Sequence, residues 1–136
     1  MKTIMCFGTF DILHLGHLYY FEQAKKYGDY LIVVIARDKT KQQQKKKIIF
    51  SEQERLKMVQ SLKVVDEAVL GNVDDHLTII EEKKPDALCL GYDQKIDEKE
   101  LKVRLAQRKL YPLVVRISSY HPHSQKSTKI RKLFGL

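Results

Sequence analysis

Short apolar runs alternate with longer stretches of helical periodicity along the 136-residue chain. The apolar runs predict strands over residues 3–7, 30–36, 67–70, 87–90 and 113–117, of which 67–70 is the weakest. Helices are predicted over residues 15–27, from residue 51 onward, and over 75–83, 97–109 and 127–134. Because strands and helices alternate, the expected fold class is α/β, with a doubly wound, parallel, five-stranded sheet and helices on both faces.

Chain length and residue spacing set further limits. A chain of this size can bury one substantial core but not two, so we expect a single domain over residues 1–136. No apolar run approaches the ~20 residues of a membrane-spanning helix, and the apolar start is too short for a signal peptide. We therefore expect a soluble, cytoplasmic protein with no membrane partner. Cys6 and Cys89 lie in separate apolar runs, which favours buried, reduced thiols over a disulfide or a metal site.

Four segments unlike the rest of the scaffold follow predicted strands. They are GTFDILHLGH (8–17), RDKTKQQQKKK (37–47), GYDQ (91–94) and SSYHPHSQKST (118–128). Ligands of doubly wound sheets bind beyond the carboxyl ends of the strands, so all four segments are expected to meet at one rim. We interpret TKQQQKKK within the second segment as a mobile loop. The net charge of +8 favours an anionic partner.

The first of these segments begins like an anion site. Gly8, Thr9 and Phe10 lie between a strand and the start of a helix, so their backbone N–H groups and the positive helix end are expected to face the rim. Neither the three-glycine dinucleotide fingerprint nor a Gly-Lys-Ser/Thr phosphate loop is present. Asp11 is expected to hydrogen-bond the turn.

Two histidines follow at the start of the same helix. His14 and His17 flank Gly16, close enough for both imidazoles to donate hydrogen bonds to one phosphate. Gly16 is expected to let a ligand approach the backbone. A zinc site built on the two histidines and Asp11 is the weaker alternative, and we assign no metal ligand.

These residues resemble the signature of the nucleotidyltransferases that carry a His-x-Gly-His motif. The likeness covers most of the chain and extends to the lysine segment, to SEQERLKMVQSLKVVDE, to GYDQ and to residues 127–130. Class I aminoacyl-tRNA synthetases share the short motif but need a much longer chain. The resemblance implies that an acceptor phosphate attacks the α-phosphorus of a nucleoside triphosphate and that pyrophosphate leaves, so catalysis consists of positioning and charge stabilisation.

The resemblance implies catalytic roles for three residues. His14 and His17 donate hydrogen bonds to the triphosphate and the transition state. Lys46 neutralises the phosphates, a role that Lys45 or Lys47 could also fill. Taken without the resemblance, these lysines are a solvated, flexible loop, and both descriptions hold if the loop closes on substrate.

Other residues are expected to bind the nucleotide. Asp93 is expected at its sugar or base, Tyr120 beside its ring, and Ser127 and Thr128 at its β- and γ-phosphates; a surface turn, plain packing and a helix cap are the alternatives. Arg55 resembles a family arginine near the phosphates but can equally pair with Glu52. The full set predicted to bind nucleotide is Gly8, Thr9, Phe10, His14, Leu15, Gly16, His17, Asp93, Tyr120, Ser127 and Thr128.

The segments VIARDKT, CLGYDQ and LYPLVVRISSY are most similar to the archaeal FAD synthetase branch. That resemblance implies an FMN adenylyltransferase, which transfers AMP from ATP to the phosphate of FMN with Mg²⁺ or a similar divalent ion, and it implies a homodimer. The alternative is a glycerol-3-phosphate cytidylyltransferase or another polyol- or sugar-phosphate nucleotidyltransferase. A basic nucleic-acid binder is disfavoured, because the aromatic residues are not interleaved with the lysines as stacking platforms.

Overall fold

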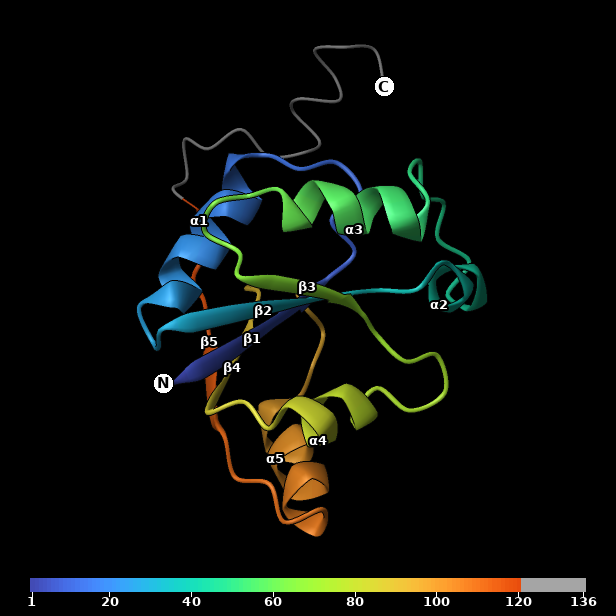
Figure 1. The fold of residues 1–136 in the computed structure, drawn as a ribbon. Coiled ribbons are helices and arrows are strands. Elements are labelled where there is room, and N and C mark those ends of the chain that lie inside the picture. The colour runs from blue at the N-terminus through green and yellow to red at the C-terminus, as the bar shows by residue number, and fades with distance from the viewer. Residues whose placement is uncertain (121–136) are drawn as a thin grey trace.

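The structure, a computed structural model, describes residues 1–120. Its elements are β1 (Thr3–Gly8), α1 (Leu15–Lys25), β2 (Tyr30–Ile35), α2 (Asp38–Gln43), α3 (Glu52–Gln60), β3 (Glu67–Leu70), α4 (Thr78–Lys83), β4 (Ala87–Leu90), α5 (Glu98–Gln107) and β5 (Leu113–Arg116). The strands form one five-stranded sheet in the order β3-β2-β1-β4-β5, and every neighbouring pair is parallel (Figure 1). The predicted α/β fold class is confirmed. The helix predicted over 127–134 lies outside the described residues.

The strand order places a topological switch between β1 and β4. From β1 the chain adds β2 and β3 on one side, and it then returns to add β4 and β5 on the other. Cys6 pairs in register with Val33 on one side and Cys89 on the other. The connections that leave β1 and β4 therefore diverge, and a crevice opens beyond their carboxyl ends.

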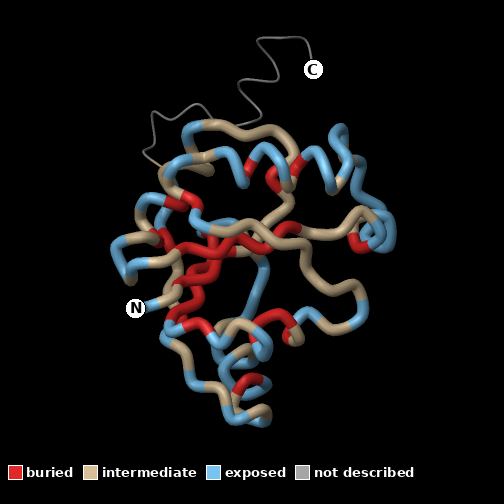
Figure 2. Tube along the Cα trace, in the orientation of Figure 1, coloured by how far each residue is buried: buried red, intermediate tan, exposed pale blue. Residues whose placement is uncertain are grey.

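Helices cover both faces of the sheet, as Figure 1 shows, with α1 and α3 on one face and α4 and α5 on the other. Alternation along β1 explains the two layers: Ile4 and Cys6 pack with Phe21 of α1, whereas Met5 packs with Leu105 of α5. The buried backbone lies along the central strands in Figure 2. No helix within residues 1–120 is long and apolar enough to cross a membrane.

The segment interpreted as a mobile loop begins with a helix that the sequence analysis missed. α2 covers Asp38–Gln43, and its end is closed by Lys45 in the left-handed conformation, with φ of 56°. The backbone N–H of Lys46 donates to the carbonyl of Lys41 at 3.0 Å, the six-to-one bond of a Schellman motif. A helix this short has no apolar stripe for periodicity to reveal, and a lysine stands where glycine usually closes the turn.

A buried arginine joins α3 to the loop after β1. Arg55 is 1% exposed, and its guanidinium donates to Asp38 Oδ1 at 2.7 Å, to the Thr9 carbonyl at 2.9 Å and to the Phe50 carbonyl at 3.1 Å. All three acceptors belong to segments that surround the carboxyl edge of the sheet. The expected pairing of Arg55 with Glu52 is wrong, because Arg55 pairs with Asp38. Arg55 does not line the cavity at this edge, and its expected place near the phosphates stays a prediction.

Glu52 instead fastens the starts of α2 and α3 together. Its carboxylate accepts the Asp38 backbone N–H at 2.8 Å, and Asp38 Oδ2 accepts the Glu52 N–H at 3.0 Å. The Arg37 side chain adds an ion pair to Glu52 at 3.2 Å. The two helix starts are thereby satisfied reciprocally, and this explains how so short a helix as α2 is held.

We predict that Arg55→Met destabilises the protein by about 3 kcal/mol, because it leaves two carbonyls and a carboxylate without their donor while largely preserving side-chain volume. The urea midpoint measures the loss. Arg104→Met is the matched control, since Arg104 is exposed on α5 and its replacement should shift stability by no more than about 0.5 kcal/mol. Equal midpoints for the two variants would contradict the structural role of Arg55.

Candidate active site

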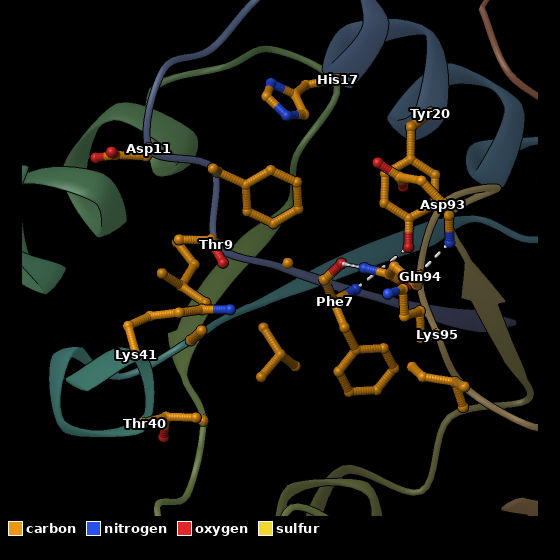
Figure 3. A pocket seen from close by; sticks show the side chains of 18 of the residues that line it. Phe7, Thr9, Asp11, His17, Tyr20, Thr40, Lys41, Asp93, Gln94 and Lys95 are labelled. Carbon is orange, nitrogen blue, oxygen red and sulfur yellow. Dashed lines mark hydrogen bonds between the residues drawn. The ribbon is translucent and has the colours of Figure 1, made fainter. Parts of the chain in front are cut away.

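A cavity of about 840 Å³ lies at the carboxyl edge of the sheet, over the switch between β1 and β4 (Figure 3). Its size is that of a typical small-molecule site. The segments after β1, β2, β4 and β5 all contribute lining residues, and so does the segment after β3. Among the predicted site residues the cavity is lined by Gly8, Thr9, Phe10, His14, Gly16, His17, Lys46, Asp93 and Tyr120.

Three of the predicted residues do not line the cavity or lie outside the described residues. Leu15 is 54% exposed and does not line the cavity. The Leu15 side chain is therefore not part of the cavity wall, and its predicted role in nucleotide binding stays a prediction. Ser127 and Thr128 lie outside the described residues, so their roles stay predictions.

The side chains of His14 and His17 cap the N-terminus of α1. His14 Nδ1 accepts the Gly16 backbone N–H at 3.0 Å, and His17 Nδ1 accepts the His14 backbone N–H at 3.3 Å. This is a capping box in which imidazoles replace the usual hydroxyl and carboxylate. Because each Nδ1 is an acceptor, the proton of each neutral ring is on Nε2, which is left as a hydrogen-bond donor.

Burial keeps both imidazoles uncharged near neutral pH. It lowers the pKa of His14, and the nearby charge of Asp93 offsets part of this effect. Burial lowers the pKa of His17 to about 4, with a further contribution from the charge of His14. The ring centroids are 4.0 Å apart, so two like charges there would repel each other strongly. The pair therefore offers two directed N–H donors rather than positive charge.

Phe10 packs its ring against His17 of the histidine pair. Its φ is 56°, and its ring folds back over Gly8, where an added Cβ would lie 2.5 Å from ring atom Cζ. The same ring meets His17 edge-on with centroids 5.3 Å apart. The backbone N–H groups of Thr9 and Phe10 donate to no acceptor within residues 1–120, which leaves them available to an anion.

Gly16 makes room for the cap. An added Cβ would lie 2.7 Å from Cε1 of His14, so the imidazole ring needs the space over Gly16. Gly16 also lines the cavity, and its predicted contact with a ligand stays a prediction. Asp11 differs from expectation, because its carboxylate accepts the N–H groups of Ile49 and Phe50 before α3.

Lysines line the side of the cavity next to α2. Lys46 lines it as predicted, whereas Lys45 and Lys47 do not. Lys41 also lines it, and Figure 3 shows its side chain pointing toward Thr9. Burial and then the charge of Lys46 lower the pKa of Lys41. Sequence reasoning missed Lys41 because the helix α2 was not predicted. Without that helix, nothing distinguishes Lys41 from the other lysines of the segment.

Gln94 is a second residue that the sequence analysis missed. Its side chain accepts the Gly91 N–H at 2.9 Å and donates to the Phe7 carbonyl at 2.6 Å (Figure 3). It thus joins the ends of β1 and β4 across the switch. Its position in the segment GYDQ, directly after a predicted strand, is the sequence feature that could have identified it.

We predict that stability falls as pH drops from about 6.5 to about 4, because the unfolded chain protonates His17 in this range while the folded protein resists it. His17→Gln keeps an acceptor for the His14 N–H without a titrating group, so its melting temperature should fall less over the same range. Thermal melts at pH 7.0, 6.0 and 5.0 measure this. Parallel curves for the two proteins would contradict the prediction.

Relatives over most of the chain share one name. A protein from Thermoplasma acidophilum named FAD synthase is 47% identical over 132 residues, which cover 97% of this chain and 93% of the relative. A FAD synthase from Methanohalophilus mahii is 49% identical over 121 residues, covering 89% and 84%.

Solved structures agree with this fold. A Thermoplasma volcanium protein, described as a lipopolysaccharide core biosynthesis protein, superposes with a TM-score of 0.87 at 47% identity, covering 89% of this chain and 99% of that one. Pantoate-β-alanine ligase from Francisella tularensis has a TM-score of 0.62 at 17% identity and shares the fold alone, covering 99% and 70%. The cytidylyltransferase-like family model matches residues 5–133. With the histidine-capped helix at the switch of a five-stranded parallel sheet, these matches show that the chain belongs to the cytidylyltransferase-like family of nucleotidyltransferases.

Proposed function

We propose that the protein is an FMN adenylyltransferase, which transfers AMP from ATP to the phosphate of FMN and releases pyrophosphate. Relatives named FAD synthase, 46–49% identical over most of the chain, support this assignment. The observation that carries it is that the cavity has two chemically different sides, one over the α1 face of the sheet and one over the α4 face.

The side over α1 suits the triphosphate. The Nε2–H donors of His14 and His17 are suited to phosphate oxygens. So are the N–H groups of Thr9 and Phe10, which have no acceptor among residues 1–120. These hydrogen bonds stabilise the transition state more than the ground state, because negative charge builds on the transferred group and on the leaving pyrophosphate. Asp93 lines the cavity close enough to His14 for its charge to affect the pKa of that residue, and its carboxylate suits the hydroxyl groups of a ribose.

The side over α4 suits a flat, largely apolar acceptor. Phe7, Val34 and Ile79 line it, and all three belong to the α4 layer of the core. Asn72 lines it too, and its buried Oδ1 accepts no hydrogen bond from residues 1–120. The imide N–H of a flavin is a donor of the missing kind. Glycerol 3-phosphate would leave this apolar wall uncovered, so the wall favours FMN over the smaller acceptor.

The two sides meet where phosphoryl transfer requires it. Attack on the α-phosphorus must be in line with the leaving pyrophosphate, so the acceptor phosphate approaches from the side away from the triphosphate tail. Lys41 and Lys46 line the cavity, and in this proposal they neutralise the phosphates that meet there. The acceptor phosphate is already a nucleophile, so no general base is needed.

A divalent ion is included in the proposal as part of the ATP complex. Within residues 1–120 no group of three histidine, cysteine or carboxylate side chains could hold a metal. We therefore assign Mg²⁺ or a similar ion to the phosphates, where it would neutralise charge. The proposal also takes residues 1–136 as one domain of a cytoplasmic homodimer.

The proposal predicts pyrophosphate release with ATP and FMN, and with no other pairing of ATP or CTP with FMN or glycerol 3-phosphate. His14→Ala should lower kcat at least 100-fold, because one of two aligned donors is lost. Coupled pyrophosphate detection and chromatography of FAD measure the reaction. Release with CTP and glycerol 3-phosphate would refute the acceptor assignment and favour the cytidylyltransferase alternative.

The lysines of α2 give a separate prediction. Lys41→Met should lower kcat/KM for FMN at least 10-fold, because the acceptor phosphate loses a partly buried positive charge. Lys39→Met is the matched control, since Lys39 is exposed on the same helix and does not line the cavity. Initial rates at varied FMN and saturating ATP measure both. Equal losses in the two variants would show that only net charge matters.

A further inference from the structure

The loop between β4 and α5 carries part of the cavity wall without regular structure of its own. Residues 91–96 line the cavity throughout, with Tyr92 and Asp93 exposed at its mouth. Within the loop, the structure gives two backbone hydrogen bonds, from the Gln94 N–H to the Gly91 carbonyl at 3.2 Å and from the Ile96 N–H to the Gln94 carbonyl at 2.9 Å. Two turn bonds alone do not fix a six-residue loop, so the contacts beneath it decide where it lies.

Arg116, the last residue of β5, is the main contact beneath the loop. Its Nη1 donates to the carbonyls of Gly91 at 2.9 Å and Gln94 at 2.7 Å, and its Nη2 donates to the Ile96 carbonyl at 2.6 Å. Its Nε pairs with the Glu98 carboxylate at 3.0 Å. One guanidinium thus binds three carbonyls of the loop and holds the loop against the end of β5.

The sheet fixes the base of this side chain. Arg116 pairs in register with Leu90, and the N–H of the next residue, Ile117, donates to the Leu90 carbonyl at 2.8 Å. Arg116 itself does not line the cavity, and its side chain is 29% exposed. Any influence on a ligand must therefore pass through the loop.

We infer that Arg116 is a positioning residue for nucleotide binding, which holds the loop of residues 91–96 so that Asp93 faces the histidine pair. This inference rests on the proposed function, because it takes the ligand at Asp93 to be the ATP of that reaction. With its carbonyls drawn to Arg116 and Gln94 tied to the Phe7 carbonyl, the loop is fixed on two sides. Asp93 remains outside both ties and faces the cavity.

Only arginine can satisfy this loop. Its planar group presents five N–H donors at fixed angles, whereas a lysine ammonium is a single point with three donors. Lysine at position 116 keeps the charge and can keep the pair with Glu98, yet it cannot reach three carbonyls in different directions. Arg116→Lys therefore separates the positioning role from the charge.

The test measures Mg–ATP binding by calorimetry, KM for FMN by pyrophosphate release, and melting temperature, for wild type, Arg116→Lys, Arg116→Met and Glu98→Gln. We expect Arg116→Lys to weaken ATP binding about 10-fold, while KM for FMN stays within about twofold and the protein remains folded. Glu98→Gln removes the ion pair and leaves the three carbonyl bonds, so its ATP affinity should equal that of wild type.

Arg116→Lys with wild-type ATP affinity would overturn the inference, and so would equal losses for ATP and FMN, which indicate general loosening. Because ATP binding is measured without FMN, the proposed function can fail separately. A wild type that binds ATP but yields no pyrophosphate with FMN, beside a weakened Arg116→Lys, refutes the acceptor and supports the positioning role. A wild type that binds no Mg–ATP refutes both.

Discussion

The structure depends on how backbone groups are satisfied where the sheet stops. Beyond the carboxyl ends of β1 and β4, the chains diverge and the ladder bonds cease, so each carbonyl and N–H needs another partner. Side chains of the protein donate to several of these carbonyls, while the N–H groups of Thr9 and Phe10 at the cavity have no acceptor in the part of the chain that the structure describes. The pairs are Arg55 with the Thr9 carbonyl, Gln94 with that of Phe7, and Arg116 with those of Gly91, Gln94 and Ile96. This division gives the rim its attraction for anions.

Hydrogen-bond direction and charge come from different residues around this rim. The histidines supply directed N–H donors and are kept neutral by burial, whereas positive charge enters from α2 through Lys41 and Lys46. The capped turn at Lys45 brings those two lysines to the same wall. In the proposed reaction, the acceptor phosphate and the leaving pyrophosphate would meet neutralising charge beside the donors that orient them.

Much of this could be predicted from the sequence, because apolar alternation is a local signal. The predicted strand starts are confirmed at residues 3, 30, 67, 87 and 113. The described parts of the segments that follow these strands line one cavity at the same edge of the sheet, as predicted. The partners of Arg55 were missed because Thr9 and Asp38 are distant in sequence and meet it only through the fold. The helix α2 was missed because its stability comes from an exchange of bonds with α3 rather than from its own residues.

The capping box of two imidazoles has a consequence for the chemistry of the rim. Each ring commits Nδ1 to a backbone N–H of α1, so tautomer exchange and ring flipping would each break the helix start. The Nε2–H bonds are consequently aimed before any substrate arrives, and no dipole has to turn when charge moves during the transfer. In water, the solvent dipoles would have to reorient during the same step, at a cost in free energy. Here the folding of α1 has already oriented the donors.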